Sequence, residues 1–484
     1  MRRLGAPLAL IAMLAGCGGG GGGSAGGTAV VPAPTPTPTP GATTPPVTTA
    51  CSVAARKDWV TARMREWYLF PETLPANPNP GGFGTVEAYL DSLTATARAQ
   101  GRDRYFTYIT SIAEENAFYQ QGASAGFGFR LSYNEAADRV YVAESYEGTP
   151  ALAAGIDRGA ELVAIGTAEN NLRSVGAIMA SEGPGGVSAA LGPSDPGVQR
   201  VIRFNEPTGT QRTVTIAKAD YAIEPVSSRY GLRVIDDGGR RVGYVNLRTF
   251  ISPADPALRN AFAQLRAQGI NDLIVDFRYN GGGLISIADL MGDLMGRDRA
   301  ASDIWSRTVF RPEKASQNST RFFNPQPQSV APMRVAFIGT SGTASASELV
   351  INAMRPYLGT NAALVGTNTF GKPVGQIGLD NAPCDDRLRV VALKVDNANG
   401  QGDYYQGLAP VMERTCQAPD DLSRPLGDPQ EASTRAALDF LAGGQCTGIA
   451  GASASLARMA APPQRQLLMP DRPSTAQREV PGSF

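Results

Sequence analysis

The sequence predicts an α/β fold in which parallel strands alternate with helices. Three short apolar runs, residues 273–275, 335–338 and 363–365, have the length and composition of buried parallel strands. Helical patterns follow the first two runs, and after the first of them Ile287, Leu290, Met291 and Leu294 recur at helical spacing. Folds of this kind place their functional site at the carboxyl ends of the strands, so we expect the site there.

Ser345 stands at one of these ends, between the strand at 335–338 and the helical pattern that begins after it. With Glu348 it forms the capping-box pattern S-x-x-E, which places the Ser345 hydroxyl at the amino end of the helix. Free backbone N–H groups and the positive end of the helix dipole stabilise an anion at that point. Ser345 is therefore a candidate nucleophile, and a plain N-cap residue is the alternative.

The chain has no histidine among its 484 residues. This excludes a Ser-His-Asp triad and any histidine-ligated metal. Lysine replaces histidine as the base in Ser-Lys variants of the triad. Lys372 lies in a Gly-flanked turn after the strand at 363–365, and a strand-helix-strand unit would bring it beside Ser345.

The motif T-A-S-A-S-E around Ser345 and the motif T-F-G-K ending at Lys372, with Gln376 four residues later, resemble those of the C-terminal processing, or tail-specific, serine peptidases. The resemblance implies that Ser345 is the nucleophile, Lys372 its general base and Gln376 the residue that orients the lysine. Two features depart from the family: the serine and lysine stand slightly farther apart, and Pro356 replaces an acidic residue often found at the end of the helix.

A run of three glycines, residues 281–283, follows the strand at 273–275 and matches the family's N-P-G-G segment. The resemblance implies an oxyanion hole in which an N–H of Gly282 or Gly283 acts with the N–H of Ala346, and losing such a donor typically costs about 2.7–4 kcal/mol of transition-state stabilisation. Taken alone, a glycine run is more often a plain turn.

Residues 126–129 read Gly-Phe-Gly-Phe, and with the alternating strand and short helix that follow they resemble a PDZ domain. In that domain the loop amides, here those of Gly126, Phe127, Gly128 and Phe129, bind a peptide carboxylate, and an edge strand accepts the peptide by β-augmentation. The usual Gly-Asp after the short helix is Gly159-Ala160 here, and simple turn chemistry is the alternative explanation of the glycines.

The amino end has a basic start, an apolar run at 4–14 and small residues before Cys17, which is the pattern of a lipoprotein signal. We expect Cys17 to become the lipidated first residue, whereas an ordinary cleaved signal is the alternative. The apolar run is too short for a membrane-spanning helix. Gly18 after the cysteine favours the outer membrane, so we expect a bacterial envelope lipoprotein that faces the periplasm.

The resemblance covers roughly residues 51–446 and implies a crotonase/ClpP-like α/β protease core with an inserted PDZ domain and a small N-terminal helical domain. Asp103-Arg104-Tyr105 resembles the family's D-R-[FY], although an Asp-Arg pair is commonly a surface salt bridge. The expected segments are 1–17, a lipoprotein signal peptide ending at Cys17; 18–50, a Gly- and Thr/Pro-rich linker; 51–119, the helical domain; 120–222, the PDZ-like domain; 223–446, the serine peptidase catalytic domain; and 447–484, a disordered tail.

Four cysteines remain besides Cys17, and in an exported protein an even count predicts two disulfides with three possible pairings. We favour Cys384 with Cys416 and Cys51 with Cys446, because the second bond would tie the start of the folded region to its end.

The prediction for function is an exported, lipid-anchored serine endopeptidase with a Ser-Lys dyad, acting on proteins or peptides with free C-termini that the PDZ-like domain presents. We expect no cofactor and no metal site. The 44 acidic and 44 basic residues balance, so no basic surface for nucleic acid is expected. The alternatives are an inert protease-like peptide-binding adaptor and a crotonase-like acyl-transfer enzyme, which needs neither the Ser-Lys pair nor a PDZ domain.

Overall fold

The computed structural model describes residues 49–450 and 465–484. The expected signal peptide with Cys17, and all but the end of the expected linker 18–50, lie outside the described residues. None of the helices that the structure describes has the length and apolar character needed to cross a membrane.

A six-stranded sheet carries the candidate site, in the order β10-β11-β12-β15-β16-β19. Its strands are β10 (Leu232–Asp237), β11 (Arg240–Asn246), β12 (Asp272–Asp276), β15 (Arg334–Gly339), β16 (Ala362–Gly366) and β19 (Thr415–Gln417). All neighbours except β10 and β11 are parallel, which confirms the predicted α/β fold. The register pairs Asp276 with Ile338 and Ile338 with Val365, so the loops that follow these strands begin side by side.

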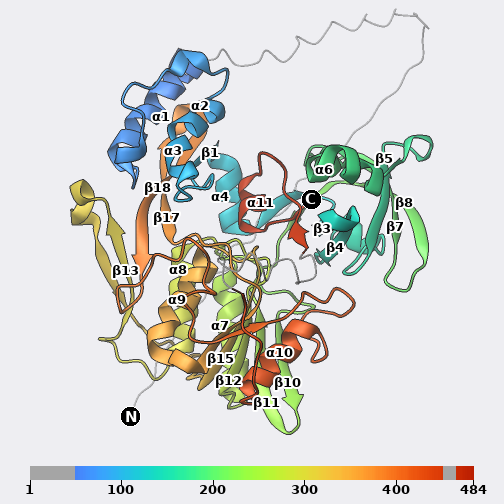
Figure 1. Ribbon diagram of the computed structural model, residues 1–484, viewed down its shortest axis with the longest axis vertical. Helices are drawn as coiled ribbons and strands as arrows, with labels where there is room; N and C mark the ends of the chain where they lie inside the picture. Colours follow the sequence, from blue (N-terminus) through green and yellow to red (C-terminus); the bar gives the residue numbers. More distant parts are fainter. Residues whose placement is uncertain (1–48, 451–464) are drawn as a thin grey trace, which may run out of the picture. The chain divides into compact units, whose positions relative to one another are not determined.

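Helices cover both faces of this sheet (Figure 1). They are α7 (Ala254–Ala267), α8 (Ile285–Met295), α9 (Ala346–Leu358) and α10 (Ala432–Leu441). Leu258, Met291 and Val350 from the first three pack with Val275 and Phe337 in one core cluster. The other face is covered by α10, whose apolar residues pack against the strand residues that point the opposite way. This two-sided burial is why the strands read as continuous apolar runs.

The N-terminal region is helical, as predicted, but it also supplies a strand. Its elements are α1 (Val53–Trp67), α2 (Val86–Leu93), α3 (Ala95–Ala99), β1 (Tyr108–Ser111) and α4 (Ile112–Gln121). β1 joins a sheet ordered β1-β18-β13-β14, in which β17 also pairs with β18. The other strands are β13 (Ile304–Phe310), β14 (Ser319–Phe322), β17 (Val374–Asn381) and β18 (Asp386–Asp396). Val60 and Met64 of α1 pack on Leu388 and Val390 of β18.

Residues 123–222 form two further sheets, of which one pairs β2 with β9 and the other has the order β20-β3-β4-β5-β7-β8 with β6 on β5. The elements are β2 (Ala123–Gly126), β3 (Phe129–Asn134), β4 (Arg139–Ser145), α5 (Pro150–Ala153), β5 (Glu161–Gly166), β6 (Arg173–Ser174), α6 (Val175–Leu191), β7 (Gln199–Asn205), β8 (Gln211–Ala217) and β9 (Ala219–Ala222). β20 (Gln466–Leu467) belongs to a distant part of the chain.

Three expectations about the C-terminal third need correction. Residues 465–484, expected to be loose, form strand β20 (Gln466–Leu467) and helix α11 (Thr475–Glu479), while 451–464 lie outside the described residues. The sequence YYQGLAPV of residues 404–411 looks like a closing strand, but the structure forms turns there. The favoured disulfide pairing is wrong, because the bonds join Cys51 to Cys384 and Cys416 to Cys446.

The physical reason for the disulfide error lies in the position of Cys384. This residue follows β17, whose sheet packs against α1, so the cysteine lies beside the start of the folded chain. Cys446 follows α10, which covers the face of the sheet that contains Cys416. Neither neighbourhood can be read from sequence spacing alone.

Candidate active site

The turn between β15 and α9 holds Ser345 in an unusual backbone conformation. Ser345 is the N-cap of α9 and has a φ of 54° and a ψ of −114°. Positive φ is rare for residues other than glycine, and it persists only where the surroundings enforce it. Here the Thr343 hydroxyl donates to Phe277 O at 2.8 Å, and the Ala344 N–H donates to Asn280 O at 3.0 Å. A strained serine at a strand-to-helix turn is the arrangement of a nucleophile elbow.

The carboxylate of Glu348 connects this turn to the loop that carries Lys372. Glu348 is fully buried, and its Oε2 accepts the backbone N–H groups of Ser345 at 3.1 Å and of Lys372 at 2.7 Å. Its Oε1 accepts the Gly371 N–H at 2.7 Å and the Thr369 hydroxyl at 2.6 Å. Burial raises the pKa of Glu348, while these four donors favour the ionised form.

The sequence indicated only half of this role. The S-x-x-E pattern predicted the contact between Glu348 and Ser345. A carboxylate can accept several hydrogen bonds, and this unused capacity of Glu348 was the one signal that could have suggested a second partner.

Lys372 and Gln376 meet as the resemblance implied. Lys372 Nζ donates to Gln376 Oε1 at 2.8 Å, and Gln376 Nε2 donates to the Phe106 carbonyl, which orients the amide with its oxygen toward the lysine. Burial lowers the pKa of Lys372; the negative charge of Glu479 opposes that shift and the positive charge of Arg478 adds to it. Gln376 holds the amine without adding a charge of its own.

The glycine run lies directly against Ser345. A Cβ on Gly282, whose φ is 125°, would lie 2.8 Å from Ser345 Cβ and 3.2 Å from Ala346 N, so only glycine fits. In this structure the Gly282 N–H donates to Asn280 Oδ1 at 3.0 Å, and the Gly281 N–H donates to Glu479 O at 3.0 Å. Of the expected oxyanion donors, Gly282 and Ala346 therefore lie together beside Ser345, whereas Gly283 pairs with Phe250 in a short β-bridge.

A buried charge cluster, not anticipated from the sequence, anchors the start of this glycine loop. Both terminal nitrogens of Arg278 bond the Glu431 carboxylate at 2.9 Å, and Arg278 also pairs with Asp276 and Asp420. Burial opposes ionisation of Glu431, but Arg278 outweighs it and lowers the pKa of Glu431 to about 2. Planar bidentate pairing of this kind fixes geometry as well as charge.

The motif Asp103-Arg104 supports the lysine loop and is not the surface salt bridge considered as the alternative. Asp103 is fully buried and accepts hydrogen bonds from the Tyr68 hydroxyl at 2.8 Å and the Thr107 hydroxyl at 2.6 Å. Arg104 instead donates to Phe370 O at 2.7 Å and Gly371 O at 2.6 Å, which holds the residues just before Lys372.

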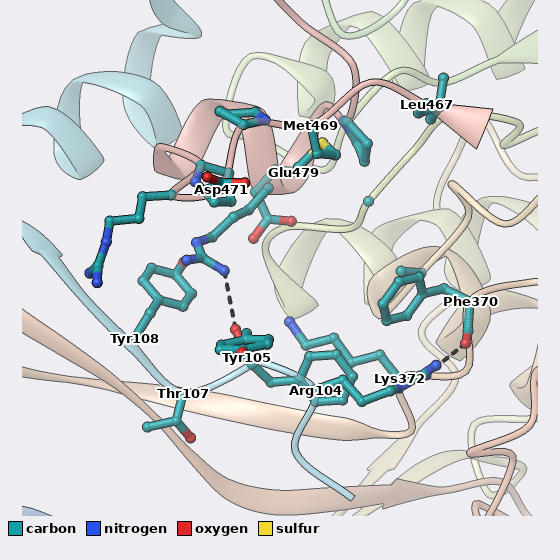
Figure 2. Close-up of a pocket in the computed structure, with 18 of the residues that line it drawn as sticks. Arg104, Tyr105, Thr107, Tyr108, Phe370, Lys372, Leu467, Met469, Asp471 and Glu479 are labelled. Carbon is teal, nitrogen blue, oxygen red and sulfur yellow. Dashed lines mark hydrogen bonds between the residues drawn. The ribbon is translucent and has the colours of Figure 1, made fainter. Parts of the chain in front are cut away.

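A cavity of about 960 Å³ opens at these residues, with Ala344 and Gly281 in its lining. Figure 2 shows Lys372, Arg104 and Phe370 on one side of the cavity and Glu479 and Met469 on the other. No group of three or more aspartate, glutamate or cysteine side chains able to hold a metal occurs among the residues for which the structure is described.

The GFGF segment, residues 126–129, spans the end of β2 and the start of β3 and does not line this cavity. Phe127 and Phe129 are buried in the core of the 123–222 region. The N–H groups of Gly128 and Phe129 donate to the Phe484 carbonyl oxygen at 2.9 and 3.4 Å.

Comparison with known proteins gives two family matches: residues 241–413 match peptidase family S41, and residues 55–108 match the peptidase S41 N-terminal domain. The carboxyl-terminal-processing protease of Picosynechococcus sp. is 27% identical over 322 residues, which cover 66% of this chain and 71% of that protein. The protease of the same name from Synechocystis sp. is 25% identical over 344 residues, covering 70% and 73%. These matches support a C-terminal processing serine peptidase.

One solved structure shares the fold of this chain. The crystal structure of a Bacteroides fragilis protein provisionally classed as an S41 protease superposes with a TM-score of 0.61 at 23% identity, covering 80% of this chain and 97% of that one. The matched S41 region 241–413 contains the strained Ser345 turn, Glu348, Lys372 and Gln376. The similarity to processing proteases implies protein or peptide substrates.

Proposed function

We propose that the protein is an exported serine endopeptidase in which Ser345 is the nucleophile and Lys372 its general base. The observation that carries the proposal is the Glu348 carboxylate, one oxygen of which accepts the backbone N–H groups of both residues. A shared acceptor holds two loops in a constant relation, and such preorganisation is what a nucleophile and its base require.

The direction in which burial shifts the pKa of Lys372 supports its role as a base. An unperturbed lysine has a pKa of about 10.4, so only about one molecule in 2,500 carries the neutral amine at pH 7. Burial lowers the pKa of Lys372, and its hydrogen-bond partner Gln376 is neutral. Both features increase the fraction of the amine that can accept a proton near neutral pH.

The proposed reaction has two steps that balance in protons. In the first, the neutral Lys372 amine takes the Ser345 hydroxyl proton, Oγ attacks the scissile carbonyl, and the lysine returns the proton to the leaving amine. In the second, lysine takes a proton from water, which attacks the acyl ester, and the proton returns to Ser345. The N–H groups of Ala346 and Gly282 are the proposed donors to the oxyanion, and Gly282 must first release Asn280 Oδ1.

We further propose that the GFGF segment binds the C-terminal end of a polypeptide in the PDZ manner, and that a lipid on Cys17 attaches the protein to the periplasmic side of the outer membrane. The first proposal is supported by the hydrogen bonds that Gly128 and Phe129 donate to a main-chain oxygen, and the second by the signal pattern that ends at Cys17.

The direct test is digestion of a denatured protein by the purified chain and by its Ser345→Ala variant, with Ser316→Ala, an exposed serine, as the control. We expect Ser345→Ala to reduce the digestion rate by at least about 10³-fold, because no other group can form the acyl ester. Ser316→Ala should digest like the parent. If the parent captures peptides and cleaves none, the protein is an inert peptide-binding adaptor.

A further inference from the structure

The last part of the chain, residues 466–484 and called here the tail segment, runs along the GFGF region and the candidate active site. It begins as β20, which pairs antiparallel with β3 through Gln466 and Tyr133 and through Leu467 and Ser132. It continues through α11 and ends at Phe484, the last residue of the sequence.

The end of the tail segment occupies the position expected for a bound peptide. The Gly128 and Phe129 N–H groups donate to Phe484 O, and the Phe484 N–H donates back to Phe129 O at 3.0 Å. The Leu131 N–H donates to Gly482 O at 2.8 Å, and Ser483 forms an antiparallel bridge with Arg130. This ladder is β-augmentation of β3 by the tail segment.

The side chain of Phe484 fills an apolar site beneath this ladder. Phe484 is 3% exposed and belongs to the same core cluster as Phe127, Phe129 and Leu468. A Cβ on Gly126 would lie 2.6 Å from the Phe484 carbonyl carbon, so the glycine is needed for this close approach. The site therefore accepts a large apolar residue of an extended segment.

Between its two paired ends, the tail segment covers the candidate active site. The Gly281 N–H donates to Glu479 O, and a Cβ on Gly281 would lie 2.2 Å from Arg478 O, so the backbone of α11 rests on the glycine loop. Glu479 is 5% exposed, and its side chain accepts the Tyr119 hydroxyl at 3.0 Å. Residues 469–473, 478 and 479 line the cavity together with Lys372.

We propose that the tail segment is an internal peptide ligand that occupies the GFGF groove, covers the active-site cavity, and is displaced by substrate tails that end in a large apolar residue. A tethered ligand competes for its binding groove at an effective concentration that is roughly millimolar for a short linker. A free peptide binds the groove only if it displaces this tethered ligand. The covered state is thus the resting state, and substrate binding uncovers the site. The effect on digestion rests on the proposed peptidase function, whereas occupation of the groove does not.

The binding test uses the full chain carrying Ser345→Ala, so that nothing is cleaved. The probe is a fluorescent peptide of residues 475–484, TAQREVPGSF, with a free carboxylate. Phe484→Ala removes the side chain that anchors the tail segment, and Phe322→Ala, an exposed phenylalanine on β14, is the matched control. We expect Phe484→Ala to bind the probe at least about tenfold more tightly than the parent and the control. A probe ending in aspartate should bind no variant well.

A second variant keeps Phe484 and links the tail segment covalently to β1, so that the tail segment stays over the cavity. The hydroxyl oxygens of Thr110 and Thr475 lie 3.3 Å apart, between β1 and the first residue of α11. In a Thr110→Cys/Thr475→Cys chain with Ser345 intact, oxidation should slow digestion at least about tenfold relative to the same chain after mild reduction. The parent under the same two conditions is the control for the native disulfides.

The outcomes separate the two proposals. Equal probe affinity in the parent and in Phe484→Ala, or equal digestion by the oxidised and reduced double-cysteine chains when the parent digests, would overturn the internal-ligand proposal. Tighter probe binding by Phe484→Ala with no digestion by any Ser345-containing chain would support the internal ligand and refute the peptidase function.

Discussion

Glu348 Oε2 lies 2.7 Å from the backbone nitrogen of Lys372 and accepts its N–H. The same oxygen accepts the Ser345 N–H, so one buried carboxylate holds the candidate nucleophile and the candidate base, which lie after the neighbouring parallel strands β15 and β16. Charge-assisted hydrogen bonds of this kind are roughly twice as strong as neutral ones.

The first prediction concerns this carboxylate. Glu348→Gln replaces one acceptor oxygen by a donor NH₂ group, which cannot satisfy the backbone N–H groups that face it. We expect kcat to fall by about 10²-fold or more, since displaced catalytic groups lose rate steeply, with little change in KM. Steady-state kinetics on a peptide substrate would measure this. Glu313→Gln, at an exposed carboxylate, is the control, and an unchanged kcat in Glu348→Gln would contradict the positioning role.

The second prediction concerns Gln376, the neutral partner of the lysine amine. Gln376→Glu places a negative charge within hydrogen-bond distance of Lys372 Nζ, which stabilises the ammonium form and raises the pKa of Lys372. The rising limb of kcat/KM against pH should therefore move upward by about 1–3 pH units. Activity at pH 7 should fall and should recover at higher pH.

The matched control for that experiment is Gln264→Glu on the exposed side of α7, which should leave the profile in place. A Gln376→Glu limb at the same pH as the parent's would show that Lys372 does not set the rate in this range.

The third prediction concerns the disulfides. The bond between Cys51 and Cys384 spans 333 residues, whereas that between Cys416 and Cys446 spans 30. Chain entropy predicts a larger stabilisation for the longer loop, with about 3 kcal/mol for a 15-residue loop and about 4.7 for 100 residues. The Cys51→Ser/Cys384→Ser chain should thus lose more unfolding free energy than the Cys416→Ser/Cys446→Ser chain. Non-reducing peptide mapping should find these two linkages, and linkage of Cys51 to Cys446 would contradict them.

The fourth prediction concerns Cys17, which lies outside the described residues. Cys17→Ser removes the thiol that would carry the lipid. We expect the variant to leave the membrane fraction and to lack the mass of the acyl chains found on the parent, because one short apolar run gives no stable anchor. Membrane fractionation and intact-mass measurement of the parent and of Cys17→Ser would test this. If both chains fractionate alike and the parent carries no acyl mass, the segment is an ordinary signal peptide.

The sequence was informative where the signal is local. Apolar runs predicted the strands that carry the site, because parallel strands that are buried on both faces appear in the sequence as continuous apolar runs. The strand-to-helix position of Ser345 followed from its spacing to Glu348, and the meeting of Lys372 with Gln376 followed from motif resemblance.

The parts that were missed depend on contacts between distant segments. Three contacts belong to this group: the hydrogen bonds from Arg104 to the lysine loop, the hydrogen bonds between Glu348 and that loop, and the disulfide pairing. Each joins residues that only the folded structure brings together. The tail segment is the largest such error. Its Pro- and Arg-containing sequence has little core-forming character of its own, and it is ordered by pairing with β3 and by the apolar site that receives Phe484.

The measurement that tests the central claim most directly is digestion of a denatured protein by Lys372→Arg across pH 6 to 10, beside Lys314→Arg, whose lysine pairs with Glu66 on the surface. Arginine keeps the positive charge but does not deprotonate in this range, so it cannot serve as a base. We predict that Lys372→Arg cleaves nothing at any pH while it keeps the parent's circular dichroism and probe binding, and that Lys314→Arg cleaves like the parent. Substantial cleavage by Lys372→Arg would contradict the Ser345-Lys372 mechanism.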